Sequence, residues 1–263
     1  MPLFSRLILV AGSFSRVRVP FPSCFPLVPG GSRTFSRLRR NVVFMNDRQT
    51  AGPVDSAAGT PSMASPGTFS VRDRKRALRR EILALRRAMP PEDRSRADDA
   101  INRKLLEIVR AEQPPALVAY ISDGTEPDLT PVLRHALDSG IPLCLPRFDE
   151  TGAYSIVTVR SLEFPASHWG IPEPAADSPA APPELLAKAL WLVPGVAFDP
   201  ALRRLGRGKG VYDRLLARGA GKTIGIFYEL QRCPVLPCEP TDMPLGAVVT
   251  ESGLSGCNNT VRS

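Results

Sequence analysis

Short apolar segments of strand length recur along the chain between residues 116 and 250. The first covers 116–121 and reads Ala-Leu-Val-Ala-Tyr-Ile, a continuous apolar run of the kind that parallel sheets bury on both faces. Further candidate strands cover 141–145, 154–159, 189–193, 223–228 and 246–250. A glycine-rich turn and a short helix at about 210–218 lie among the last three. Strands that alternate with helices in this way indicate a layered α/β fold.

Helical patterns precede the first of these strands. Ser70 and Asp73 have the spacing of a capping box, after which apolar side chains recur every three or four residues. This apolar stripe consists of Leu78, Ile82, Leu85 and Met89. A second helix is expected after the proline pair at 90–91, and a third begins with Thr130 as its N-cap and ends at Gly140. We therefore predict a three-layer α/β/α fold with a mostly parallel, Rossmann-like sheet and N-terminal helices.

Residues 1–69 differ in composition from the rest of the chain. The first 46 residues contain seven arginines, no lysine and no acidic residue, a composition that resembles an organellar transit peptide. The alternative is an upstream stretch translated from a misassigned start, because Met45 and Met63 both precede the first credible helix. We expect 1–69 to be a disordered leader and linker, 70–255 to be the folded domain, and 256–263 to be a flexible tail. The expected compartment is the cytoplasm, with an organelle as the alternative.

Charge and cysteine content exclude several classes of function. The formal net charge is +8, but residues 1–70 contribute +6 of it, so a basic nucleic-acid-binding domain is disfavoured. No run approaches 18 apolar residues, so we expect no membrane span. Five scattered cysteines without a C-x-x-C pair, and only two histidines, do not match a disulfide framework or a zinc site. We expect a monomer that binds small molecules.

The segment 194–213 carries the most informative chemistry. A buried strand ends at Pro194, and the loop that follows places glycines at the alternate positions 206, 208 and 210. Because glycine lacks a Cβ, backbone N–H groups can approach an anion closely, and the next helix adds its positive N-terminal end. Arg204, Arg207 and Lys209 supply charged donors to phosphate oxygens. The segment therefore predicts a phosphate-binding turn.

The spacing does not fit two common phosphate loops. Gly210 follows Lys209, so no G-x-x-x-x-G-K-[ST] pattern is present, and Val211 stands where G-x-G-x-x-G needs its last glycine. The residues alone leave a turn of unassigned type, with a basic surface turn before a helix as the alternative. Asp213, one turn into the helix, is a candidate Mg²⁺ ligand or simply a carboxylate favoured by the helix dipole.

These residues resemble the 5-formyltetrahydrofolate cyclo-ligase (5,10-methenyltetrahydrofolate synthetase) family. The family pattern P-G-x-x-F-D…R-L-G-R-G-K-G-x-Y-D is present at 194–213. Four further pieces match: K-R-x-L-R at 75–79, the acidic pair Glu126 and Asp128 after the first strand, W-x-I-P-E-P at 169–174, and Asp242 followed by Met243. The five pieces keep the family's order over about 70–250, essentially the whole region expected to fold.

The resemblance implies a role for each matching residue. The contacts to ATP would be Lys75, Arg76, Arg79, Arg204, Leu205, Gly206, Arg207, Gly208, Lys209, Gly210, Val211 and Tyr212. The contacts to the folate would be Ile121, Glu126, Trp169, Arg207 and Val211. Asp213 and Asp242 would be the Mg²⁺ ligands, since carboxylate oxygens suit that ion beside phosphate. ATP and Mg²⁺ are the implied cofactors, and the implied partner is 5-formyltetrahydrofolate, with or without a polyglutamate tail.

The implied reaction is an ATP-driven ring closure to 5,10-methenyltetrahydrofolate, ADP and phosphate. The formyl oxygen attacks the γ-phosphate, and N10 then attacks the activated carbon and expels phosphate. Lys209 and Arg207 would be the catalytic residues, because phosphoryl transfer needs positioning and charge neutralisation rather than a nucleophilic side chain. The alternatives are a similar ATP-binding protein that acts on another metabolite and a non-catalytic regulatory protein.

Three positions depart from the family. Val211 replaces a common tyrosine. In the acidic segment, Pro127 replaces a common valine or isoleucine and stiffens the turn, and Leu129 replaces a common threonine and lacks its hydroxyl. These changes fall on the folate side and leave the ATP side intact. Val211 and Leu129 favour the alternative in which the substrate is another metabolite.

Overall fold

The computed structural model describes residues 70–148, 154–164 and 172–256. All of them belong to one compact unit, 63–263. The predictions made for the leader and linker at 1–69 and for the tail from 257 onward lie outside the described residues. Residue 256 is the last residue of the final strand, one position beyond the predicted domain end.

A seven-stranded sheet forms the centre, in the order β3-β2-β1-β4-β7-β8-β9. The strands are β1 Leu117–Val118, β2 Leu143–Phe148, β3 Tyr154–Val159, β4 Leu190–Pro194, β7 Lys222–Ile226, β8 Ala247–Thr250 and β9 Gly253–Gly256. The five central strands are parallel, and the edge strands β3 and β9 pair antiparallel with their neighbours. The prediction of a mostly parallel α/β sheet is confirmed.

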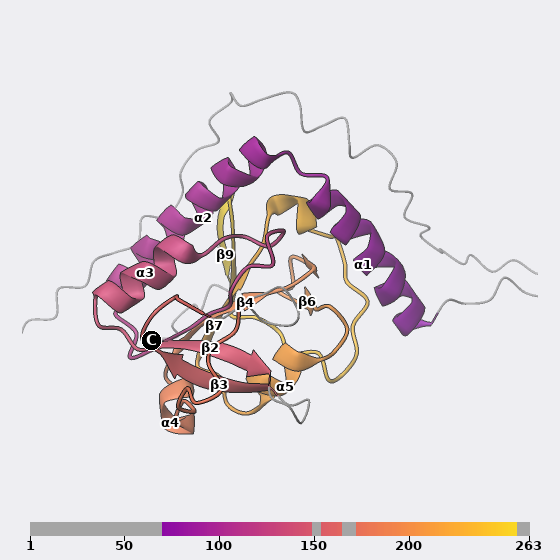
Figure 1. The fold of residues 1–263 in the computed structure, drawn as a ribbon. Coiled ribbons are helices and arrows are strands. Elements are labelled where there is room, and N and C mark those ends of the chain that lie inside the picture. Colours follow the sequence, from indigo (N-terminus) through magenta and orange to yellow (C-terminus); the bar gives the residue numbers. More distant parts are fainter. Residues whose placement is uncertain (1–69, 149–153, 165–171, 257–263) are drawn as a thin grey trace, which may run out of the picture. The chain divides into compact units, whose positions relative to one another are not determined.

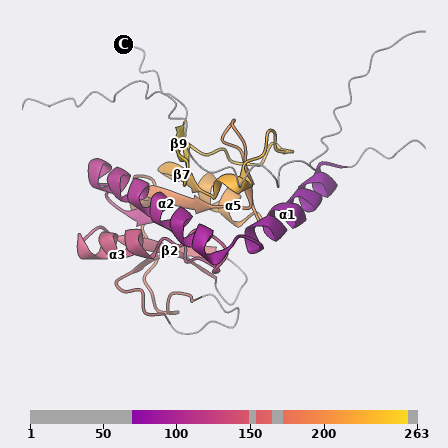
Figure 2. The same ribbon diagram turned by 90° about the horizontal axis from the view of Figure 1, so that it is seen from above.

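Helices cover both faces of this sheet. The long helix α2 (Pro91–Glu112) and α3 (Thr130–Asp138) lie side by side (Figure 1, Figure 2) and bury Ile101 and Leu133 against one face. The short helices α4 (Pro183–Leu186) and α5 (Val211–Ala217) pack on the other face. Strand β4 shows why: Leu192 joins the first core and Trp191 the second, because successive side chains of a strand point to opposite faces.

The first helix, α1 (Val71–Arg87), lies against a different part of the molecule. It packs on the short helix η2 (Glu229–Gln231), and its Ile82 joins a third core with Val196 and Leu205. Leu205 belongs to a small antiparallel hairpin of β5 (Ala197–Phe198) and β6 (Arg204–Leu205). The helix therefore supports the hairpin from which the glycine-spaced loop leaves.

Several local expectations need correction. The N-cap of α3 is Leu129, and Thr130 is already the first helical residue; Asp128 Oδ1 accepts hydrogen bonds from the backbone N–H and hydroxyl of Thr130. Only Leu117 and Val118 of the run 116–121 form strand β1. The segments β5, β6, β9 and α4 were not predicted, because two to four residues are too few to show a period.

The order of the strands sets the position of the site. Strand β1 lies between β2, which follows it in the chain through α3, and β4, which comes later. The chain therefore leaves the carboxyl ends of β1 and β4 in opposite directions. In α/β sheets such a reversal opens a crevice in which ligands bind.

Candidate functional site

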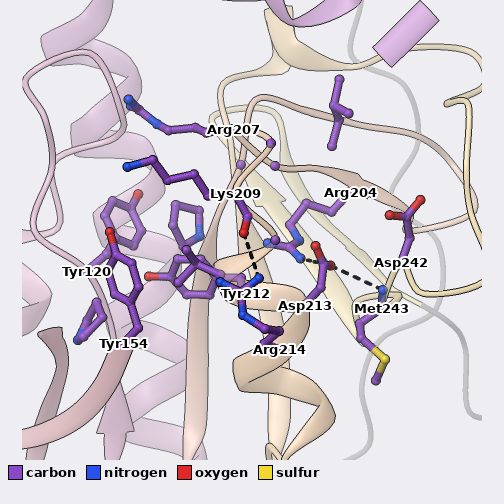
Figure 3. A pocket seen from close by; sticks show the side chains of 18 of the residues that line it. Tyr120, Tyr154, Arg204, Arg207, Lys209, Tyr212, Asp213, Arg214, Asp242 and Met243 are labelled. Carbon is purple, nitrogen blue, oxygen red and sulfur yellow. Dashed lines mark hydrogen bonds and ion pairs between the residues drawn. The ribbon is translucent and has the colours of Figure 1, made fainter. Parts of the chain in front are cut away.

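A pocket of about 980 Å³ lies at the carboxyl ends of β1 and β4. Residues that follow β1 (Tyr120, Ile121 and Glu126) and β4 (Gly195) line it together with 204–214. Lys75 and Arg79 of α1, the segment 172–174 and the segment 239–243 also line it, as do residues of β2 and β3 that include Phe148 and Tyr154. All five sequence pieces quoted above therefore contribute residues to one pocket, and Figure 3 shows it from close by.

The loop 206–210 joins β6 to α5 in the conformation that its glycines permit. Gly208 and Gly210 have φ of 104° and 63°, a backbone region that residues with a Cβ rarely adopt. Arg79 Nε donates to the Gly206 carbonyl at 2.7 Å, and Arg214 Nη1 donates to the Lys209 carbonyl at 2.9 Å. These two arginines fix the loop from α1 and from α5.

Arg204, which is buried, forms an ion pair with the partly exposed Asp213 next to the loop. Arg204 Nη2 lies 2.5 Å from Asp213 Oδ1, and the arginine side chain is only 2% exposed. Burial lowers the pKa of Arg204, and Asp213 opposes that shift. Within the described part of the chain, Arg204 Nε and the Tyr212 hydroxyl are buried without a hydrogen-bond partner. Such donors fit an incoming anion with several oxygens.

Lys75 connects α1 to the carboxylates of the segment 239–243. Its Nζ lies 2.6 Å from Asp242 Oδ2 and 2.8 Å from Glu239 Oε2. Burial works against the charge of Lys75, but the hydrogen bonds to Asp242 and Glu239 raise its pKa above the ordinary value. Lys75 is therefore a permanently charged group held among acceptors.

Arg207 bridges to the loop that follows β1. Its Nη2 contacts Asp123 Oδ2 and lies 3.1 Å from Glu126 Oε1. Burial raises the pKa of Glu126, although Arg207 pulls it down. Burial also acts on Asp123, but Arg207 and the Thr125 hydrogen bonds outweigh it and hold the pKa of Asp123 well below its usual range.

The two carboxylates expected to hold Mg²⁺ lie in the same part of the pocket. The backbone N–H of Met243 contacts Asp213 Oδ1 at 3.5 Å, so the residue after Asp242 touches Asp213 (Figure 3). No group of three or more His, Cys, Asp or Glu suited to a metal occurs among residues 70–148, 154–164 and 172–256. Two carboxylates fit Mg²⁺, which commonly takes one or two and fills its shell with phosphate and water.

Figure 3 also shows how the pocket is divided. Arg207 and Lys209 extend from the loop to the side on which Tyr120 and Tyr154 lie, and Asp213 and Asp242 lie on the other side. The loop therefore separates an aromatic side from a carboxylate side.

Some expected residues lie elsewhere. Arg76 is exposed, forms an ion pair with Asp73 at 3.0 Å, and does not line the pocket. Asp128 lines a separate pocket of about 640 Å³. Trp169 lies outside the described residues. Ile121 and Val211, which were predicted to contact the folate, both line the main pocket.

Among the residues that the sequence analysis did not single out, three charged ones lie at the pocket or directly behind it: Asp123, Glu239 and Arg86. Asp123 lies in the loop after β1, two positions beyond the apolar run 116–121, and an acidic residue near a strand's carboxyl end is a signal that could have found it. Glu239 stands three residues before Asp242, in the same loop. Arg86 stands four residues after Ile82 and three before Met89, so its place on the apolar stripe of α1 is a signal that could have found it.

Among the described residues, no helix is long and apolar enough to cross a membrane.

Comparisons with known proteins agree with this architecture. The sequence model of the 5-formyltetrahydrofolate cyclo-ligase family matches residues 71–251. A probable 5-formyltetrahydrofolate cyclo-ligase of Caenorhabditis elegans is 27% identical over 201 residues, which cover 69% of this chain and 95% of that protein. A mitochondrial 5-formyltetrahydrofolate cyclo-ligase of Arabidopsis thaliana is 29% identical over 265 residues, which cover 85% of this chain and 95% of that protein.

A solved structure is also similar. The NMR structure of Aquifex aeolicus 5,10-methenyltetrahydrofolate synthetase shares 31% identity with this chain and has a TM-score of 0.62. The similarity covers 70% of this chain and 93% of that one. Since the family match runs from the start of α1 past the end of β8, the chain belongs to the 5-formyltetrahydrofolate cyclo-ligase family.

Proposed function

We propose that this protein is an ATP- and Mg²⁺-dependent 5-formyltetrahydrofolate cyclo-ligase. The observation that carries the proposal is the position of the loop 206–210, which lies between the aromatic side and the carboxylate side of one pocket and extends Arg207 and Lys209 to the aromatic side. A triphosphate on the carboxylate side and a folate on the aromatic side would meet at these two cations. The family membership supports the same activity.

In the first step, the formyl oxygen attacks the γ-phosphorus and the bond to the bridging oxygen of ADP breaks. Backbone N–H groups of 206–210 and the Lys209 ammonium would hold the transferring group in line and neutralise its charge. Arg207 would leave Asp123 and Glu126 to contact the γ-phosphate. In the second step N10 attacks the activated carbon, the carbon–oxygen bond breaks, phosphate leaves, and N10 loses its proton.

Asp213 and Asp242 are the residues that would hold Mg²⁺. When bound, the ion would neutralise charge on the β- and γ-phosphates. Lys75, Arg79 and Arg204 would contact the nucleotide from α1 and β6. Ile121, Glu126 and Val211 would contact the folate. Pro172, Glu173 and Pro174 line the same pocket.

We propose that the protein is located in the cytoplasm and that its oligomeric state is a monomer. The composition of residues 1–46 and the mitochondrial relative support the organellar alternative. A fluorescent protein fused to the C-terminus of the full chain separates the two compartments: diffuse fluorescence supports the cytoplasm, and colocalisation with an organelle marker supports the alternative.

The activity is tested on the full chain with ATP, Mg²⁺ and 5-formyltetrahydrofolate, while the methenyl chromophore and phosphate are followed together. The proposal expects one phosphate per methenyl group formed, and neither product without ATP. Tight ATP binding without methenyl formation would support action on another metabolite. Neither ATP binding nor product would support a regulatory protein.

A further inference from the structure

Arg86 is a fully buried arginine behind the wall of the pocket. It lies in the last turn of α1, has 0% residue exposure, and does not line the cavity itself. Its guanidinium donates to the Gly195 carbonyl at 3.3 Å and to the Thr125 hydroxyl at 2.8 Å. It therefore joins the segment after β4 to the segment after β1, the two that flank the crevice.

The same guanidinium faces the two carboxylates that hold Arg207. Arg86 Nη2 lies 3.7 Å from Asp123 Oδ2, and Arg86 Nη1 lies 3.8 Å from Glu126 Oε1. Arg207 reaches the same oxygens from the pocket side. Arg86 is 1% exposed at its side chain and Arg207 is 48% exposed. Two carboxylates are thus shared by a fixed arginine at the back and an accessible one at the front.

This sharing matters when Arg207 turns to a phosphate. If Arg207 were the sole cation near Asp123 and Glu126, its departure would leave two largely buried carboxylates without a counter-charge, a strongly unfavourable state. Arg86 cannot leave, because it is enclosed and anchored on Gly195 and Thr125. Arg86 therefore supplies the counter-charge for Asp123 and Glu126 when Arg207 moves away from them.

We propose that Arg86 is a positioning residue, which keeps Asp123 and Glu126 charged and in place while Arg207 turns from them to the triphosphate. The inference rests on the proposed function for the movement of Arg207, but the charge cluster that carries it is present in the ligand-free protein. Arg86 touches neither nucleotide nor folate in this account.

The cluster also predicts how Glu126 titrates. Glu126 is faced by Asp123 from its own loop, Arg86 from α1, Arg207 from the loop 206–210, and the hydroxyls of Tyr120 and Tyr212. Removal of the Arg86 charge disfavours the ionised form, so the pKa of Glu126 rises. The acid limb of kcat/KM for the folate then moves to higher pH.

The test compares Arg86→Met with Arg86→Lys and with the double variant Arg86→Met/Asp123→Asn. The control is Arg80→Met, an exposed arginine of the same helix. We expect Arg86→Met to lower kcat/KM for ATP on the order of 100-fold, the scale of a misplaced reacting group. Because the double variant removes one of the two carboxylates, it should recover at least tenfold of that loss, and Arg86→Lys should recover part of it.

A second measurement needs no turnover. NMR titration of the Glu126 carboxyl in the ligand-free protein should give a higher pKa in Arg86→Met than in the wild type and in Arg80→Met. An unchanged Glu126 titration, or a double variant as impaired as the single one, overturns the proposal. If Arg86→Met does not fold, kcat/KM for ATP and the Glu126 titration are compared between the wild type, Arg86→Lys and the double variant instead. If the wild type formed no methenyl product but Arg86→Met still raised the pKa of Glu126, the proposed function would be refuted and the role of Arg86 in the charge cluster would stand.

Discussion

At the scale of single residues, the central feature is a set of cations that each have a different partner. Arg204 forms an ion pair with Asp213. Lys75 pairs with Asp242 and Glu239. Arg207 pairs with Asp123 and Glu126. A polyphosphate that entered this pocket would meet charged donors already gathered around it. Electrostatic stabilisation of this preorganised kind is a large source of catalytic power.

Lys209 gives the first prediction. Its replacement by alanine should lower kcat by about 100- to 1000-fold, the usual cost of one preorganised donor to a transition state. The readout is the initial rate of methenyl formation at saturating ATP and folate. Lys222→Ala is the matched control, because Lys222 lies at the amino end of β7 and pairs with Glu112 at 2.8 Å. Equal activity of both variants would contradict a catalytic role for Lys209.

Val211 gives the second prediction. It lines the pocket at the first residue of α5, where the family commonly has tyrosine. We expect Val211→Tyr to lower KM for the folate, because the added ring would contact the substrate. Val235→Tyr adds the same ring at a position 64% exposed and serves as the control. An unchanged or higher KM for the folate would show that the missing ring does not matter.

The residues of the loop could be predicted from the sequence, and their partners could not. Three alternate glycines with Arg207 and Lys209 between them were enough to predict a phosphate-binding turn, with a basic surface turn as the alternative. The contacts of Arg207 with Asp123 and Glu126 join positions more than 80 residues apart. No local pattern encodes such a pair.

At the scale of elements, the loop 206–210 depends on backbone freedom and on α1. Gly208→Ala adds a Cβ at φ 104° and places it 3.4 Å from Arg79 Cζ. Gly219→Ala meets the same backbone strain at φ 102° with nothing within 4 Å. Thermal unfolding should therefore shift similarly in both variants, whereas KM for ATP should rise at least tenfold only in Gly208→Ala. A normal KM for ATP in Gly208→Ala would contradict the role of this turn.

The contacts of helix α1 also lead to a prediction about metal binding. Lys75 holds Asp242 and Glu239, and Arg204 holds Asp213, so these carboxylates already have a counter-charge. We expect the wild type to bind Mn²⁺, used as a paramagnetic probe for Mg²⁺, only when nucleotide is present. Lys75→Met should bind Mn²⁺ without nucleotide, because it exposes two carboxylates.

Electron paramagnetic resonance of free Mn²⁺ gives the readout for this prediction. Lys104→Met removes an exposed ion pair with Glu107 on α2 and is the control. Strong Mn²⁺ binding by the nucleotide-free wild type would refute the prediction, and so would a Lys75→Met variant that binds none.

At the scale of the whole molecule, the alternation of apolar runs and helices was enough to predict the layered sheet. The direction of the edge strands could not be predicted, because the residue pattern of 154–159 is the same for a parallel and an antiparallel strand. The strand order was not predicted either, because it depends on which runs pair across the sheet. That order places β1 beside β4 and so creates the crevice that the loop 206–210 closes.

The account as a whole requires that the formyl oxygen receive the terminal phosphoryl group of ATP. The most direct measurement supplies 5-formyltetrahydrofolate with ¹⁸O in the formyl group and determines the isotope content of the phosphate released by the full chain. We predict that each phosphate formed with a methenyl group carries one ¹⁸O atom from the folate. Unlabelled phosphate, with the label left in the folate or found in water, would contradict the mechanism.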